Sequence, residues 1–156
     1  MRVQSYKNLA RFIQKTENFL LKNEVSNNLF WEALGGLIKK PSPSAWAGSI
    51  LNDGKIQLCA VRTEANYLLL SKGKEDAITH LNNYSKKKKW GLNGVSGPSQ
   101  CSLAFARNWL EDLPDQLDGR RDFLIYESPN KVPDWKGENE GKYSMKVVGS
   151  KEWPRA

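Results

Sequence analysis

The sequence is poor in the residues on which disulfide-rich, metal-binding and membrane-spanning proteins depend. It has two cysteines and one histidine among 156 residues, too few for a disulfide framework or a typical zinc site. No apolar run approaches the roughly 18 residues that a membrane-spanning helix needs. The beginning of the chain has no apolar stretch of the kind found in secretory signals. We therefore expect a cytoplasmic protein with reduced thiols, no metal and no membrane segment.

Positive charge is what the sequence has in excess. The net charge is +7, and apolar residues make up 39% of the chain, enough for it to fold around a core. Residues 1–44 carry seven Lys/Arg against three Glu, residues 45–97 eight against four, and residues 98–156 nine against ten. The run Lys86–Lys89 supplies four of these positive charges. Such an excess favours anionic partners in general, and an ordinary solvated surface is the alternative.

Apolar spacing predicts an α+β fold. The expected elements are a short strand over 1–4, helices over 5–22 and 29–38, strands over 45–51, 55–63 and 66–70, a helix over 75–89, a strand over 91–95, a helix over 99–113 with Ser99 as its N-cap, and strands over 123–126 and 143–148. The turn Asn52-Asp53-Gly54 predicts a hairpin, so the middle strands should be antiparallel. Later strands separated by helices should be parallel, which predicts a mixed, mostly antiparallel sheet with helices on both faces.

This order of elements resembles the GNAT superfamily of acyl-CoA-dependent N-acetyltransferases, whose fold runs β-α-α-β-β-β-α-β-α-β. Short segments narrow the resemblance to the N-terminal lobe of bacterial proteins that contain two GNAT-type lobes. These segments are residues 19–29 (FLLKNEVSNNL), 59–63 (CAVRT), 68–71 (LLLS), 91–98 (GLNGVSGP) and 104–109 (AFARNW). Their order and spacing match over roughly residues 15–150, and no single segment is diagnostic.

The resemblance implies that the chain holds one lobe of such a protein. Residues 1–127 would form the GNAT-like N-terminal lobe, and residues 128–156 a loop and one strand that resemble the start of a second lobe. In those proteins the second lobe carries the acetyl-CoA site, so this lobe would lack the usual catalytic half. A homodimer or a separate second lobe is then a candidate partner, and Trp135 and Trp153 in polar segments are candidate interface residues.

The resemblance also implies acetyl-CoA as cofactor. The family signature, Arg/Gln-x-x-Gly-x-Gly/Ala, holds the pyrophosphate on backbone N–H groups at the start of a helix. The matching place here has Lys72, Gly73 and Lys74, with one glycine instead of two, so the loop is a degenerate version of the signature. Glu75 and Asp76 follow at once and compete with an anion. A tentative anion site and an ordinary strand–helix turn are both compatible with this segment.

No catalytic residue can be assigned from the sequence. The candidates for acid–base chemistry are His80, Glu64, Tyr126 and Cys59, and each is also explained by packing or by solvent exposure. Nothing in their spacing predicts a nucleophile–base pair.

Two functions follow from these observations. The first is an acetyltransferase-related protein that binds acetyl-CoA in a cleft between the strands at 66–70 and 91–95. The second is a non-catalytic GNAT-like lobe that acts by binding a protein partner. Lys86–Lys89 followed by Trp90 also suits phosphate and base contacts. Because no nucleic-acid-binding motif accompanies this run, we do not expect nucleic-acid binding from the sequence.

Overall fold

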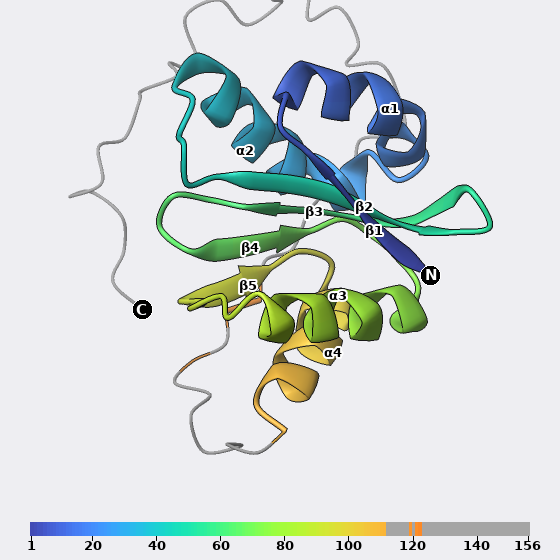
Figure 1. Cartoon of the computed structure of the whole chain (residues 1–156), viewed down its shortest axis with the longest axis vertical. Helices are drawn as coiled ribbons and strands as arrows, with labels where there is room; N and C mark the ends of the chain where they lie inside the picture. Colours follow the sequence, from blue (N-terminus) through green and yellow to red (C-terminus); the bar gives the residue numbers. More distant parts are fainter. Residues whose placement is uncertain (112–118, 120, 123–156) are drawn as a thin grey trace, which may run out of the picture. The chain divides into compact units, whose positions relative to one another are not determined.

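The computed structural model describes residues 1–111, 119, 121 and 122. The chain divides into a unit over Met1–Ile125 and a second over Tyr126–Ala156, and all described residues belong to the first. Within that unit five strands form one sheet, with two helices on each face (Figure 1). The strands predicted over 123–126 and 143–148, and the candidate interface residues Trp135 and Trp153, lie outside the described residues.

The described elements confirm the predicted α+β class. In chain order they are β1 (Arg2–Tyr6), α1 (Leu9–Leu21), the 3₁₀ turn η1 (Val25–Asn27), α2 (Asn28–Lys39), β2 (Trp46–Asn52), β3 (Lys55–Arg62), β4 (Tyr67–Leu70), α3 (Glu75–Lys87), β5 (Gly94–Ser96) and α4 (Ser99–Trp109). None of these helices is both long and apolar enough to cross a bilayer. The first helix starts later than its spacing predicts, because Ser5 and Tyr6 continue β1 and pair with β2.

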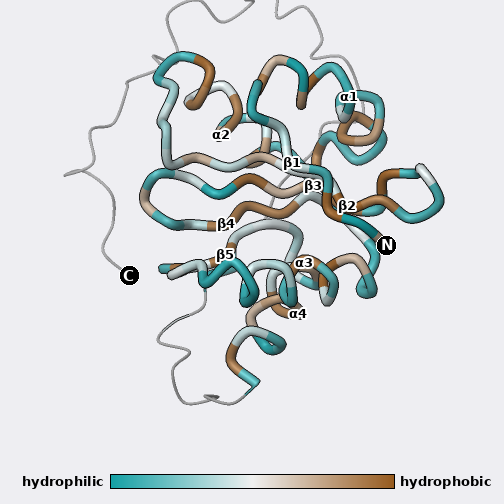
Figure 2. The backbone as a smooth tube through the Cα atoms, in the orientation of Figure 1, coloured by the Kyte–Doolittle hydropathy of each residue, from teal (hydrophilic) through white to brown (hydrophobic). Residues whose placement is uncertain are grey.

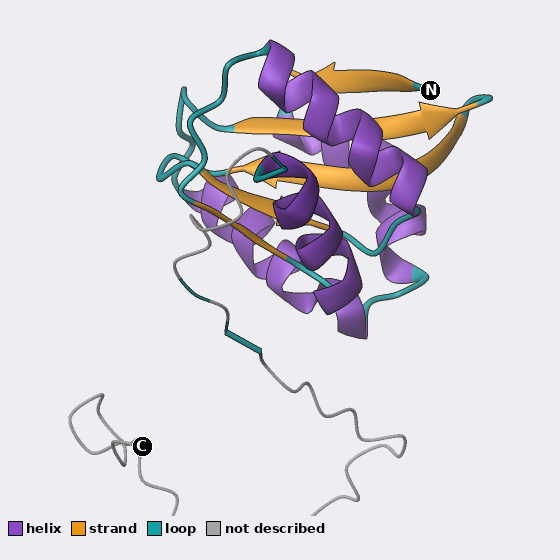
Figure 3. Cartoon of the chain, turned by 90° about the horizontal axis from the view of Figure 1, so that it is seen from below, coloured by secondary structure: helices purple, strands orange, loops and turns teal. Residues whose placement is uncertain are grey.

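The strands lie in the sheet in the order in which they occur in the chain. Neighbours are antiparallel from β1 to β4, and β5 runs parallel to β4, so α3 serves as the crossover between them. Figure 3 shows the strands side by side with the helices against the sheet. At the β2–β3 turn Asp53 and Gly54 have φ values of 48° and 76°. Two consecutive positive φ values characterise a type I′ hairpin turn, which confirms the predicted hairpin.

The sheet separates two apolar cores, and β3 contributes to both. Leu58 and Ala60 pack against the side of α3 and α4, whereas Cys59 and Val61 pack against the side of α1 and α2. All four side chains have 0% exposure. Figure 2 shows apolar residues along the central strands and a mixture of polar and apolar residues along the helices. Burial on both faces explains why β3 shows little of the apolar–polar alternation of a half-exposed strand.

The C-terminal end of α3 is closed by a lysine in an unusual backbone conformation. Lys89 has a φ of 54°, in the left-handed region that glycine and asparagine favour. Its N–H group donates to the Lys86 carbonyl at 2.9 Å, and the Trp90 N–H group donates to the Ser85 carbonyl at 3.1 Å. These two bonds form a Schellman motif, in which glycine usually takes the position of Lys89.

We predict that Lys89→Gly stabilises the protein. Glycine adopts the left-handed conformation without the clash of a Cβ atom, so we expect a gain of about 1 kcal/mol in the free energy of unfolding. The control is Lys87→Gly, which removes the same side chain from within the helix and should cost about 1 kcal/mol. Urea denaturation measures both changes. If Lys89→Gly lowered the free energy of unfolding as much as Lys87→Gly does, the backbone of Lys89 would not be strained.

Candidate functional site

A pocket of about 380 Å³ lies at the end of the parallel strand pair. Leu69 and Leu70 of β4 and Val95 and Ser96 of β5 line one side, and residues of η1, α2 and the start of α4 line the others. The two strands stay paired as far as Leu69 and Ser96. The strands therefore leave no cleft between them along this pairing, which corrects the prediction, and the pocket lies beyond their last pair, beside η1 and the first turn of α2.

The rim of this pocket depends on Gly97. Its φ is 149°, and a Cβ atom there would lie 2.5 Å from the Leu70 carbonyl oxygen, so only glycine lets the chain pass so close to β4. The chain then turns into α4 at Pro98, which is the N-cap residue and provides no side-chain cap. The prediction that Ser99 is the N-cap is wrong by one residue, because Ser99 is already helical.

Hydroxyl and charged groups supply the polar part of the pocket lining. Hydroxyls come from Ser26, Ser96, Ser99 and Ser102, and the charged lining residues are of both signs, Arg121 and Asp122. Phe30 and the leucines of β4 supply apolar surface. A concave site with an apolar wall and a few polar groups is typical of small-molecule binding, and its volume lies within the usual range of about 300–1,000 Å³.

The candidate anion loop, Lys72–Lys74, uses much of its own backbone for packing. The Lys72 N–H group donates to Oδ1 of Asn27 at 2.9 Å, and the Lys74 N–H group donates to the Gln57 carbonyl at 3.3 Å. Two of the three N–H groups expected to hold a pyrophosphate therefore have acceptors within the protein. The side chains of Lys72 and Lys74 are exposed, and no side chain caps the adjoining start of α3.

Gly73 is fixed against the central strand. A Cβ atom there would lie 2.6 Å from Cδ1 of Leu58 and 2.8 Å from the Gln57 carbonyl oxygen. The Cys101 thiol donates to the Gly73 carbonyl at 3.7 Å, which joins the loop to the first turn of α4. The single glycine of this loop is therefore explained by close packing on β3, independently of any bound phosphate.

Asn27 is a site residue that the sequence does not reveal. It is buried, with 1% exposure. Its side-chain N–H group donates to the Leu20 carbonyl at 2.8 Å, and its side-chain oxygen accepts from the Lys72 N–H group. The side chain thus connects the end of α1 to the β4–α3 loop. In the sequence Asn27 belongs to a polar junction between two helices, and such junctions are usually solvated.

The residues considered for acid–base chemistry are not brought together. Cys59 is fully buried, and burial raises the pKa of its thiol, which the hydroxyl of Thr16 offsets only in part. His80 lies half-buried in α3, and Glu64 is exposed after β3. Tyr126 lies outside the described residues. Both cysteines are free thiols, and within the described residues no three His, Cys, Asp or Glu side chains are grouped to hold a metal.

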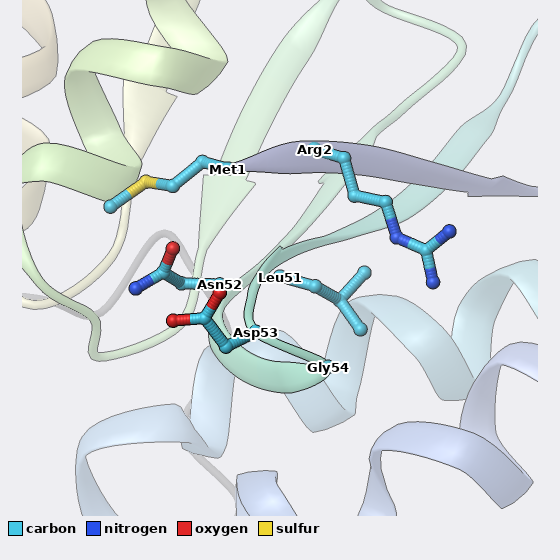
Figure 4. A pocket seen from close by; sticks show the side chains of 6 residues that line it. All are labelled: Met1, Arg2, Leu51, Asn52, Asp53 and Gly54. Carbon is cyan, nitrogen blue, oxygen red and sulfur yellow. The ribbon is translucent and has the colours of Figure 1, made fainter.

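A second hollow lies at the C-terminal end of β2, between the start of β1 and the β2–β3 turn (Figure 4). It measures about 360 Å³. The side chains of Arg2 and Asp53 point away from each other across it (Figure 4). Because its polar groups do not converge on a common point, it has none of the features of a specific binding site.

No family model, curated protein or solved structure matches this chain. The function is therefore inferred from the fold and from the pocket at the end of β4 and β5.

We predict that Asn27→Ala destabilises the protein and loosens the candidate anion loop. The substitution leaves the Lys72 N–H group without its acceptor and removes one of the donors to the Leu20 carbonyl, which still accepts from the Asn23 N–H group, so it should cost about 1–3 kcal/mol. Hydrogen exchange should then show faster exchange of the Lys72 amide. The control is Asn83→Ala at an exposed position of α3, which should change stability by less than about 0.5 kcal/mol. Equal effects of the two substitutions would contradict the role of Asn27.

We predict that Cys59→Ala changes the alkaline sensitivity of the protein. Burial raises the pKa of Cys59 in the folded state, so above about pH 8.5 the thiol ionises only in unfolded chains. Each unit of pH then lowers wild-type stability by up to about 1.4 kcal/mol through this group. Cys59→Ala should be the less stable protein at neutral pH, and the difference should narrow toward about pH 10. Urea denaturation across this range measures it, and a constant difference would contradict the buried, protonated thiol.

Proposed function

We propose that this protein is a GNAT-type, acetyltransferase-related protein that binds acetyl-CoA. The described element order, β1-α1-α2-β2-β3-β4-α3-β5-α4, is the order that the family resemblance predicts. The antiparallel β1–β4 and the parallel β4–β5 pair support the proposal further. The two free thiols agree with a cytoplasmic location.

The pocket at the end of β4 and β5 is the observation that carries this proposal. It opens where α4 begins, and Lys72, Gly73 and Lys74 are not among its lining residues. The candidate anion loop is a neighbour of the pocket, because it follows β4 directly and contacts α4 through Cys101. Helix starts favour anions, and the exposed ammonium groups of Lys72 and Lys74 add positive charge. An acyl-CoA combines both requirements, because it carries phosphates at one end and an apolar acyl group at the other.

A non-catalytic lobe that acts through a protein partner is the second candidate. It is favoured by the use of the Lys72 and Lys74 N–H groups within the protein, which leaves a weaker phosphate site than the family signature provides. The separation of Cys59, His80 and Glu64 also favours it, since acetyl transfer needs a base beside the acceptor amine. The two candidates differ in a single measurable property, the affinity for acetyl-CoA.

Calorimetric titration with acetyl-CoA and with CoA tests the proposal. We expect micromolar binding of acetyl-CoA by the wild-type protein. Ser26→Trp should abolish this binding, because Ser26 is exposed on the pocket lining and an indole would fill the space. Lys72→Gln with Lys74→Gln should weaken it about tenfold, consistent with the loss of two charge-assisted phosphate contacts.

The matched control is Gln14→Trp, which places an indole on the exposed surface of α1 away from the pocket lining and should leave the affinity unchanged. An absence of heat and of thermal stabilisation with the wild-type protein would reject acetyl-CoA binding and favour the non-catalytic lobe. Binding that survives Ser26→Trp would reject the pocket as the site.

A further inference from the structure

Three aromatic rings from separate parts of the chain meet beside the lysine run. They belong to Trp46 at the start of β2, Tyr84 in α3 and Trp90 after α3. The ring centroids of Trp46 and Trp90 are 4.8 Å apart, and each lies 5.8 Å from that of Tyr84. All three side chains are partly exposed. Together with Arg62 and Lys86–Lys89 they form what we call the aromatic–basic surface.

Hydrogen bonds and a stacked cation hold these rings in place. The Trp46 Nε1–H group donates to Oγ of Ser5 at 3.0 Å, and the same hydroxyl lies 3.3 Å from the Tyr84 hydroxyl. The Arg62 guanidinium lies 4.8 Å from the centroid of the Trp90 ring and donates to the Ser44 carbonyl at 3.1 Å. The rings are therefore ordered before any partner binds, which reduces the entropy lost on binding.

The charged side chains that β1, β2, β3 and the C-terminal part of α3 contribute near these rings are all positive. Lys86–Lys89 are all exposed, and Nζ of Lys88 lies 5.7 Å from the centroid of the Tyr84 ring. The strands β1, β2 and β3 contain no Asp or Glu, and neither does α3 beyond Asp76. A partner at this surface thus meets cations and aromatic rings together, without acidic groups from these elements to repel it.

The conformation of Lys89 gives independent support for a role of this charge. A glycine at this position would close α3 without strain, yet a lysine occupies the left-handed conformation. Lys86 and Lys87 in the last turn already complement the helix dipole, so the dipole does not require a fourth lysine. Strained residues that stability alone would not select are concentrated at functional sites.

From these observations we infer that the aromatic–basic surface binds single-stranded nucleic acid. The lysines would contact the phosphates, and unpaired bases would stack on the exposed parts of the rings. An acidic protein would contact the lysines but would have no need of the rings. The bases of a duplex are paired and stacked on each other, so they are not available to stack on the rings. The surface is composed of residues other than those lining the pocket, so this inference does not depend on acetyl-CoA binding.

Fluorescence anisotropy with a labelled single strand of about ten nucleotides and the full chain tests the inference. We expect log K to fall with log salt concentration with a slope of about −2 to −3, as three or four phosphate contacts predict. Lys87→Gln with Lys88→Gln should weaken binding and reduce the size of the slope by about 1.4. The matched control, Lys39→Gln with Lys40→Gln, removes the same charge from the end of α2 and should change the affinity by less than about twofold.

The contribution of the rings is tested separately. Trp90→Leu should weaken binding about tenfold, as the loss of one stacked base predicts, and should leave the salt slope unchanged. If thermal melting shows that the Trp90→Leu variant does not fold, the same binding measurement is made with Tyr84→Leu.

The inference is overturned if the strand does not bind or if the two lysine pairs have equal effects. Equal affinity for a duplex, for heparin or for anionic vesicles would also overturn it, because each of these offers charge without exposed bases.

Discussion

The structure depends on the burial of one strand from both sides. β3 is the middle strand of the sheet, and its alternate side chains belong to two different cores. The helix pairs α1–α2 and α3–α4 have no shared core, so each pair packs against one face of the same sheet, on different side chains of β3. Gly73 lies directly against this strand, and the pocket is reached from β3 across a single neighbour, β4. A disturbance of β3 would therefore reach the cores and the candidate site together.

Local patterns in the sequence were sufficient to predict most of the described fold. Helical spacing predicted α1 to α4, the Asn-Asp-Gly turn predicted the β2–β3 hairpin, and the β-α-β order predicted a parallel β5. Errors occurred where distant partners decide the structure. Tyr6 extends β1 because it pairs with Ala47 of β2. The predicted end of the helix over 99–113 was also wrong, since α4 ends at Trp109.

The site was less predictable than the fold, and the reason is physical. The sequence identified the β4–α3 loop as a candidate anion site, but the use of its N–H groups depends on Asn27, which is 45 residues away from Lys72. The aromatic–basic surface was difficult to predict for the same reason, because it also joins residues that are distant in the sequence. Lys86–Lys89 and Trp90 are visible as a run, whereas Trp46 and Arg62 join them only because β2 and β3 pair at that register. Sequence patterns report neighbours along the chain, and these sites are made of neighbours in space.

The pairing of β1 with β2 also constrains the order in which the chain can fold. β1 is synthesised before α1 and α2, and its partner β2 begins only at Trp46, after both helices. The tight β2–β3 hairpin can form from adjacent residues, whereas β1 has to wait for a loop of two helices to close. During synthesis the N-terminal strand thus stays unpaired until the hairpin exists, and its exposed N–H and C=O groups make this the stage at which the nascent chain is most open to pairing with another strand.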